Sequence, residues 1–277
     1  MTPFTLARTE RLLLERRVSG GDGRIARSAY CIDVAIPEGP APPAGWPSVY
    51  LLDASDCFGT CVEALRRMSR RPNATGVSPA VVVGISWPDG DAALARRQYD
   101  FTTARHGMAS KEAGGAHAFL AFLQEGVKPL VAERLPLDEG RQTLFGHSLA
   151  GYFALWVLTH RPRAFRSYAA ISPSIWWDRN GLLDAAFRVA LGDRRVLIAL
   201  GEWEDELPPW QATSSDRAEV IARRKARAMV ANARELSMRL QAALGEDGVR
   251  WLLLPEEDHA SIVSVAIPRM LRLASLP

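Results

Sequence analysis

The segment from Thr143 to Tyr152 contains the residues of this chain that are best suited to chemistry. A short apolar run leads into Gly-His-Ser-Leu-Ala-Gly, and an apolar, helix-like stretch follows. This layout is typical of a nucleophile elbow, a tight strand-to-helix turn that exposes a serine hydroxyl. The turn needs small residues beside the serine, because the backbone passes too close for larger side chains. Gly146 and Ala150 fill these places, so the sequence predicts Ser148 as a nucleophile; a Gly-Ser turn that only opens a buried helix is the alternative.

A serine hydroxyl is a weak nucleophile and needs a base that is itself oriented by a third group. In sheets that carry such an elbow, the acid and then the histidine follow the serine along the chain, on loops at the carboxyl ends of strands. Of the five histidines, only His259 follows the last apolar run, in the segment Leu-Pro-Glu-Glu-Asp-His. We therefore predict His259 as the base and expect the turn to point His147 elsewhere; a solvated histidine in an acidic loop is the alternative.

The acid is expected in the segment Gly-Glu-Trp-Glu-Asp-Glu, which directly follows the apolar run at residues 196–200. Glu204 lies three residues after the glycine that ends this run, and it is the predicted acid. Glu202 and Asp205 stay open as alternatives, and Asp178, after an earlier run, is a further candidate. An acidic surface loop without a catalytic role would also account for this segment.

Two backbone N–H groups are needed to stabilise the oxyanion of an acyl-transfer intermediate. The residue after the nucleophile supplies one of them, and the loop after the third strand supplies the other. The first donor is therefore predicted at Leu149. The second is predicted at Ser55, with Ala54 as the alternative, in the loop that follows the apolar run Val-Tyr-Leu-Leu.

The order of the predicted elements indicates an α/β fold. Strands are predicted at residues 11–18, 28–36, 48–53, 80–86, 142–145, 168–171, 196–200 and 249–254. The first two flank the Gly-Gly-Asp-Gly of residues 20–23 as an antiparallel hairpin. Helices are predicted at residues 57–70, 115–134, 149–160, 182–191, 216–244 and 261–273. This alternation predicts a single α/β domain over residues 1–277, an eight-stranded, mostly parallel sheet with helices on both faces.

Composition excludes several other classes of protein. Hydrophobic content of 48% and charged content of 23% are ordinary for a packed globular protein. A net charge of +3 is too small to indicate nucleic acid as a partner. No apolar run reaches the ~18 residues of a membrane span, and the charged first 17 residues show no export signal. The three cysteines lack the pairing of a metal site, so we expect reduced thiols in a cytoplasmic protein.

One basic run, Arg-Arg-Lys-Ala-Arg at residues 223–227, could suggest a nucleic-acid patch. Glu219 and Glu235 lie nearby and no aromatic residues interleave with the basic ones. A solvated helix face is therefore the preferred interpretation.

Several segments together resemble a known family. The elbow at residues 146–155, Tyr-Ala-Ala-Ile-Ser-Pro-Ser-Ile-Trp-Trp-Asp at residues 168–178, Val-Gly-Ile at residues 83–85 and Arg-Arg-Gln-Tyr-Asp-Phe-Thr at residues 96–102 carry the likeness. From about residue 48 to its end, the chain is similar to the putative-esterase branch of the α/β-hydrolase superfamily. Within that branch it resembles the trilactone siderophore esterases that cleave enterobactin, salmochelin and bacillibactin.

The resemblance implies hydrolysis of the serine-ester backbone of a catecholate siderophore, often still iron-loaded, for iron acquisition. Carried over by position, Ser148 is the nucleophile and His259 the base, and some members of the group rely on a Ser–His dyad. The chain departs from the group at Ala150 and at Ala54, where glycine is usual. We do not expect the extra N-terminal domain that some enterobactin esterases carry. Ser172 and Ser174 lie outside the elbow, and we expect them to be ordinary loop hydrogen-bonding residues.

A ferric tris-catecholate is a trianion with aromatic faces, so its pocket should offer arginines and aromatic rings. Such residues fall on loops predicted at, or leading from, carboxyl ends of strands: Trp87, Arg96, Arg97, Trp176, Trp177 and Trp203. We predict all of these except Trp203 as substrate-binding. The alternatives are that the tryptophans cover the core and that Arg97 pairs with Asp100.

The predicted activity is that of a serine esterase acting on a small-molecule ester. Neither a cofactor nor a catalytic metal is expected, since any iron would arrive with the substrate. One rival is a general carboxylesterase of the same branch that acts on small acyl or aromatic-acid esters. The other is a non-catalytic α/β-hydrolase that binds a ligand or a partner.

Overall fold

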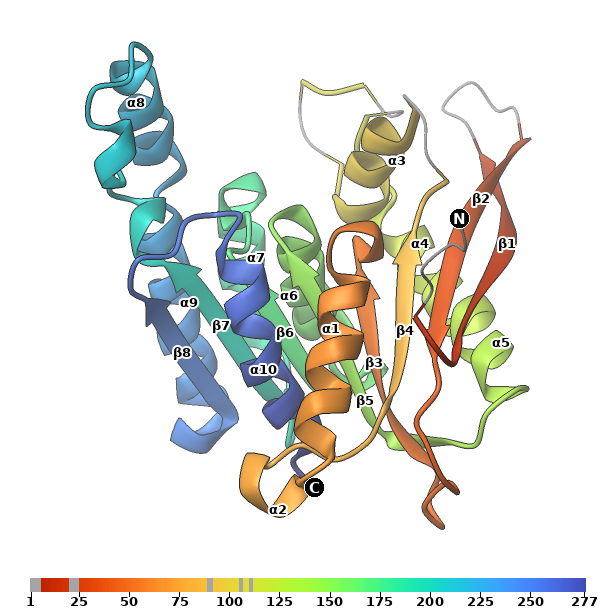
Figure 1. The fold of residues 1–277 in the computed structure, drawn as a ribbon. Helices are drawn as coiled ribbons and strands as arrows, with labels where there is room; N and C mark the ends of the chain where they lie inside the picture. Colours follow the sequence, from red (N-terminus) through yellow and green to blue (C-terminus); the bar gives the residue numbers. More distant parts are fainter. Residues whose placement is uncertain (1–5, 20–24, 89–91, 105–106, 110–111) are drawn as a thin grey trace, which may run out of the picture. The chain divides into compact units, whose positions relative to one another are not determined.

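A computed structural model describes residues 6–19, 25–88, 92–104, 107–109 and 112–277 (Figure 1). Its eight strands are hydrogen-bonded in the order β1-β2-β4-β3-β5-β6-β7-β8, which confirms the predicted eight-stranded, mostly parallel sheet. The chain forms two compact units, residues 1–143 with 274–277 and residues 144–273. That residues 1–277 behave as one domain stays a prediction.

The strands of the first unit combine an antiparallel hairpin with buried parallel strands. Their bounds are β1 Thr9–Ser19, β2 Ile25–Ala35, β3 Trp46–Leu52 and β4 Val81–Ser86, and β5, Leu137–His147, begins in this unit. The pairs β1–β2 and β2–β4 are antiparallel, and β3–β4 is parallel. The predicted hairpin is thus confirmed, while its Gly-Gly-Asp-Gly turn lies outside the described residues. Every residue of β3 and β4 is buried, as expected for strands covered on both faces.

Helices lie on both faces of these strands (Figure 1). They are α1 Ala54–Ser69, α2 Pro72–Thr75, α3 Ala92–Phe101, α4 Ala116–Phe122 and α5 Lys128–Ala132, with a π-helical turn, Leu123–Val127, joining the last two. On one face α1 packs on β4, and on the other Phe119 and Phe122 contact the ring of Tyr30 in β2. The prediction of a loop around Arg96 is wrong. These residues form helix α3, because its alanines, leucine and arginines are good helix formers.

The second unit is a run of parallel strands with helices before and behind. Its strands are the end of β5, then β6 Ser167–Ile171, β7 Arg195–Gly201 and β8 Val249–Leu254. Its helices are α6 Leu149–His160, α7 Arg179–Arg188, α8 Arg217–Arg227, α9 Met229–Leu244 and α10 Ile262–Ser275. In Figure 1, α10 lies in front of β7 and α9 behind it. Helix α6 is apolar nearly all round and almost fully buried, and it begins and ends where the sequence predicts.

One predicted helix, residues 216–244, is in fact two. The chain breaks at Ala228, which has φ 44° and ψ 50°, so α8 and α9 meet at an angle. A left-handed alanine costs roughly 1–2 kcal/mol, and alanine otherwise favours helix most strongly. The sequence therefore gives no sign of this break.

The cysteines Cys31, Cys57 and Cys61 are buried and form no disulfide, as predicted. Burial raises the pKa of Cys57 to about 12, with a further rise from the charge of Asp53. No helix among the described residues is long and apolar enough to cross a membrane.

Gly84 lets α1 approach β4. A Cβ atom at this position would lie 2.7 Å from Ala54 Cβ and 2.8 Å from Phe58 Cδ2. Because Ala54 cannot rotate away, we expect Gly84→Ala to push the start of α1 outward and lower the free energy of unfolding by about 1–3 kcal/mol. Chemical denaturation measures this loss. Gly126→Ala is the control, since its added Cβ would find only ordinary contacts of 3.4 Å or more, and an equal loss in both variants would contradict the packing argument.

Candidate active site

Ser148 stands at the junction of β5 and α6 with a backbone conformation that L-residues rarely adopt. Its φ is 58° and its ψ is −119°, and strain of this kind costs on the order of 1–3 kcal/mol. The Ser148 N–H donates to the carbonyl of Ile171 at 3.0 Å, which ties the turn to the neighbouring strand β6. A side chain on Gly146 would overlap the backbone of Ala150. The small residue expected before the serine is thus required by the turn itself.

The structure brings the three predicted catalytic side chains into one hydrogen-bonded chain. His259 Nε2 lies 3.1 Å from Ser148 Oγ, and His259 Nδ1 lies 2.9 Å from Glu204 Oε2. The Glu204 side chain is 1% exposed, whereas that of His259 is 45% exposed. An Nδ1–H that donates to the carboxylate leaves Nε2 free to accept the serine proton. This is the arrangement that general-base activation of a serine requires.

Two loops must meet for this contact, one after β7 and one after β8. Gly201, the last residue of β7, has no room for a side chain because the carbonyl of Glu257 lies against it. Trp203 N–H donates to that same carbonyl at 3.0 Å, and Glu202 Oε2 accepts the Glu256 N–H at 2.9 Å. These contacts hold the loop that carries His259 against the loop that carries Glu204.

The acidic alternatives have other partners. Glu202 binds the backbone of the β8 loop, and Asp205 Oδ1 accepts a long bond of 3.4 Å from the Val230 N–H. Asp178 caps α7 by accepting from the Gly181 N–H at 3.1 Å. Among the acids considered from the sequence, Glu204 is therefore the one whose carboxylate contacts His259.

Ser172 has a larger part in the site than the sequence suggested. It is fully buried, with φ 45°, and its hydroxyl donates to Glu204 Oε1. The Gly201 N–H donates to the same oxygen at 3.2 Å. Glu204 Oε1 is thus held by two donors while Oε2 faces His259. The available signal was the position of Ser172 directly after a predicted strand, at the edge where such sheets build their sites.

Ser174 and His147 also adjoin the catalytic side chains. Ser174 Oγ lies 3.4 Å from Ser148 Oγ, and its N–H donates to the Ser148 carbonyl at 3.0 Å. The expectation that His147 points elsewhere is wrong. Its Nε2–H donates to the carbonyl of His259 at 2.7 Å, and the two imidazole rings lie 4.7 Å apart. His147 therefore helps to hold the backbone of the predicted base.

The oxyanion donors come from different units. The Leu149 N–H is the first of α6, where a helix leaves its N–H groups without intrahelical partners. Ser55 is exposed in the first turn of α1, in the first unit, beside the alternative donor Ala54. That the Ser55 amide serves the reaction at Ser148 stays a prediction.

The three predicted substrate residues of the first unit are held by two buried aspartates, Asp100 and Asp53. Arg96 pairs with the buried Asp100 at 2.8 Å, and Trp87 Nε1–H donates to Asp100 Oδ2 at 3.1 Å. Burial raises the pKa of Asp100, and the charge of Arg96 opposes that rise. Arg97 is held by Asp53 through two bonds of 2.7 Å, so the alternative considered for it, a pairing with Asp100, is wrong. Contact of these side chains with substrate stays a prediction.

The tryptophans that follow β6 and β7 differ in exposure. Trp177 is buried, while Trp176 is partly exposed in the same 3₁₀ turn, Ile175–Trp177. Trp203, after β7, is partly exposed and packs edge-to-face on Trp210. Of the two tryptophans predicted in this turn, Trp176 is therefore the more exposed. No group of His, Cys, Asp or Glu among the described residues is arranged to hold a metal ion.

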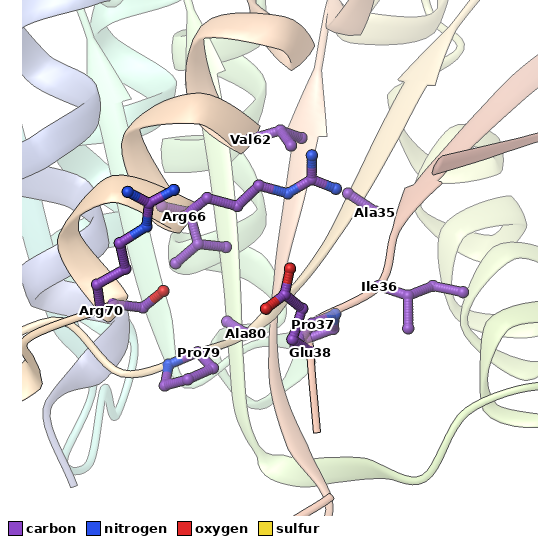
Figure 2. Close-up of a pocket in the computed structure, with 11 residues that line it drawn as sticks. Ala35, Ile36, Pro37, Glu38, Val62, Arg66, Arg70, Pro79 and Ala80 are labelled. Atoms are coloured by element: carbon purple, nitrogen blue, oxygen red, sulfur yellow. The ribbon is translucent and has the colours of Figure 1, made fainter. Parts of the chain in front are cut away.

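The first unit also contains a pocket of about 290 Å³ that was not predicted from the sequence (Figure 2). Its charged lining residues are Arg66 of α1, Arg70 at the C-terminal cap of that helix, and Glu38 of the loop after β2. It includes Ala80, at the amino end of β4, whereas Trp87 follows the carboxyl end of the same strand. The length of β4, ~20 Å, therefore separates this pocket from the predicted residues of that unit.

Comparison with known proteins identifies the family of this chain. The family described as "Putative esterase" matches residues 27–257. The chain is 39% identical to the ferri-bacillibactin esterase BesA of Bacillus subtilis, over 90% of this chain and 85% of that protein. It is 35% identical to the siderophore enterobactin esterase of Emericella nidulans, over 86% of each. The crystal structure of the BES protein from Bacillus cereus superposes with a TM-score of 0.80 at 31% identity, covering 100% of this chain and 98% of that one. The resemblance predicted from the elbow and the tryptophan segment is confirmed.

We expect Glu204→Ala to lower kcat for p-nitrophenyl butyrate about 10³- to 10⁴-fold, because the imidazole loses both its orientation and the stabilisation of its charged form. Asp205→Ala is the matched control, since Asp205 is exposed and adjacent but has no contact with His259 in the structure, and its kcat should stay within twofold. Steady-state kinetics measures both. A Glu204→Ala enzyme that retained its rate would show that a Ser–His dyad suffices.

Ser172→Ala should lower kcat about tenfold with little change in KM, because a hydrogen bond to a charged group contributes about 1.5–3 kcal/mol and Glu204 would be less firmly held. The control is Ser237→Ala, since Ser237 is equally buried and its hydroxyl has no partner among the described residues. An equal loss of kcat in the two variants would show that Ser172 contributes only to core packing.

Proposed function

This chain belongs to the putative esterase family, and we propose that it hydrolyses the trilactone backbone of a ferric catecholate siderophore. Family membership makes it a serine hydrolase of carboxylic esters. The observation that carries the catalytic part of the proposal is the hydrogen-bonded chain from Glu204 through His259 to Ser148. The substrate part is supported by the names of the relatives, which act on ferri-bacillibactin and enterobactin.

In the proposed reaction, His259 Nε2 takes the proton of Ser148 as Oγ attacks the ester carbonyl. The carbonyl electron pair moves onto oxygen and forms a tetrahedral oxyanion, which the amides of Leu149 and Ser55, or Ala54 in place of Ser55, stabilise. Collapse of this intermediate expels the alcohol, which takes the proton from His259. Water, deprotonated by His259, then attacks the acyl-enzyme. The bond between Ser148 Oγ and the acyl carbon breaks, His259 returns the proton to Oγ, and the acid is released.

Glu204 has two roles in this sequence. Its carboxylate keeps the Nδ1–H tautomer of His259, and its charge stabilises the imidazolium that forms at each proton transfer. The buried position of Glu204 strengthens this interaction, because little water is present to screen it. No resident metal takes part in any step, and iron enters and leaves as cargo of the siderophore.

The ester backbone of a trilactone offers three equivalent carbonyls, so stepwise cleavage gives linear products of decreasing length. Each cleavage removes part of the ring that preorganises the catecholates around the metal. Hydrolysis is therefore expected to weaken the hold on iron.

Incubation with iron-loaded and iron-free enterobactin and bacillibactin, followed by chromatography of the products, tests the proposal. We expect linear fragments from the wild-type protein, and Ser148→Ala should lower the rate at least 10³-fold. Rapid turnover of p-nitrophenyl butyrate with both siderophores left intact would instead identify a general carboxylesterase. An unchanged rate in Ser148→Ala would exclude the proposed mechanism.

A further inference from the structure

The last turn of α8 places a guanidinium group against an aromatic ring of the second unit. Arg227 Cζ lies 4.8 Å from the centre of the Trp176 ring, a distance typical of a cation–π contact. Arg227 is exposed and Trp176 is partly exposed, so both remain open to a ligand. The sequence predicted a solvated helix face here, and this holds for Arg223 and Lys225, which are exposed.

This pair lies close to the nucleophile. Trp176 follows Ser174 by two residues, and Ser174 Oγ is 3.4 Å from Ser148 Oγ. Two residues span at most ~7 Å of chain, so the backbone of Trp176 lies within about that distance of Ser174. Helix α8 stands at the end of the sheet toward which β7 and β8 point (Figure 1), and this is the end where parallel sheets build their sites.

The charge of Arg227 is not neutralised by an acid. No ion pair joins Arg227 to any carboxylate in the part of the chain that the structure describes, whereas Arg223 pairs with Glu219 and Arg179 with Glu235. Desolvation, with the charge of Arg223 adding to it, lowers the pKa of Arg227. Two like charges held together in this way favour the binding of an anion, because an anion relieves their repulsion.

The backbone fixes Arg227 in this position. Ala228, the next residue, takes the left-handed conformation that ends α8. The Arg227 carbonyl accepts from Asn232 Nδ2 at 2.9 Å, and Asn232 Oδ1 accepts from Arg179 Nε at 2.9 Å. A basic residue in the last turn of any helix complements the helix dipole. The helix dipole would account for a basic residue at this position. It does not account for the left-handed Ala228 or for the Trp176 indole against the guanidinium.

We propose that Trp176 and Arg227 form a binding site for an anionic catecholate ring of the ferric ligand. This inference rests on the proposed function and adds residues to its substrate site. Two parallel N–H groups of the Arg227 guanidinium can donate to the two adjacent oxygens of a catecholate. The Trp176 indole provides an aromatic surface for the catecholate ring. Iron-free catechols are protonated and neutral at pH 7, so the site discriminates in favour of the iron-loaded trianion.

Ligand binding to the Ser148→Ala protein, which cannot turn over its ligand, tests this site. Ferric and iron-free enterobactin are titrated separately while the quenching of tryptophan fluorescence is followed. Adding Arg227→Gln should weaken binding of the ferric ligand about tenfold, weaken binding of the iron-free ligand less than threefold, and reduce the salt dependence of the former. Arg227→Lys, which keeps the charge without the fork, should give an intermediate loss.

Arg234→Gln, an exposed arginine on α9, is the matched control and should leave both affinities unchanged. Circular dichroism verifies that each variant is folded. Equal weakening for ferric and iron-free ligands, or no weakening in Arg227→Gln, would overturn the proposed site even if the wild-type enzyme hydrolyses both siderophores. Conversely, selective weakening by Arg227→Gln combined with no hydrolysis by the wild type would support the binding site and overturn the esterase proposal.

Discussion

The arrangement of the second unit depends on keeping one carboxylate, that of Glu204, charged and almost completely out of water. An ionised group in such a place is tolerated only when hydrogen-bond donors surround it. Ser172, Gly201 and His259 supply those donors, one from the turn after β6, one from the end of β7 and one from the loop after β8. The carboxyl ends of β6, β7 and β8 must therefore lie side by side. Residue 201 must be glycine because the loop after β8 passes too close for a side chain.

Backbone strain gathers where the reacting groups are held. Ser148 and Ser172 both have positive φ without being glycine, and each lies in a turn that brings its hydroxyl to a partner in the predicted site. Such conformations persist only when the surrounding structure over-determines them. The buried strands β6 and β7 and the fully packed helix α6 provide that support. The packed core thus stabilises the strained turns.

The sequence predicted those features that local pattern controls. Local pattern predicted the small residues around Ser148 and the bounds of α6. The geometry of parallel sheets predicted that Glu204 and then His259 follow the serine, each after the end of a strand. Other features depend on contacts between distant segments and could not be predicted in this way. The hydroxyl of Ser172 has meaning only once Glu204 is folded against it, and Arg97 meets Asp53 rather than its helical neighbour Asp100. The break at Ala228 opposes the intrinsic preference of alanine, so only tertiary structure can impose it.

Almost half of the His259 side chain is accessible to water, while its carboxylate partner is sealed beneath it. A base placed in this way exchanges protons directly with bulk solvent and needs no internal relay to reset between turnovers. The exposed imidazole edge also means that the reacting atoms do not lie at the bottom of a narrow tunnel. This exposure suits the proposed substrate, a bulky and rigid ferric siderophore, which would present its rim to Ser148 and whose hydrolysed fragments would leave along the same side.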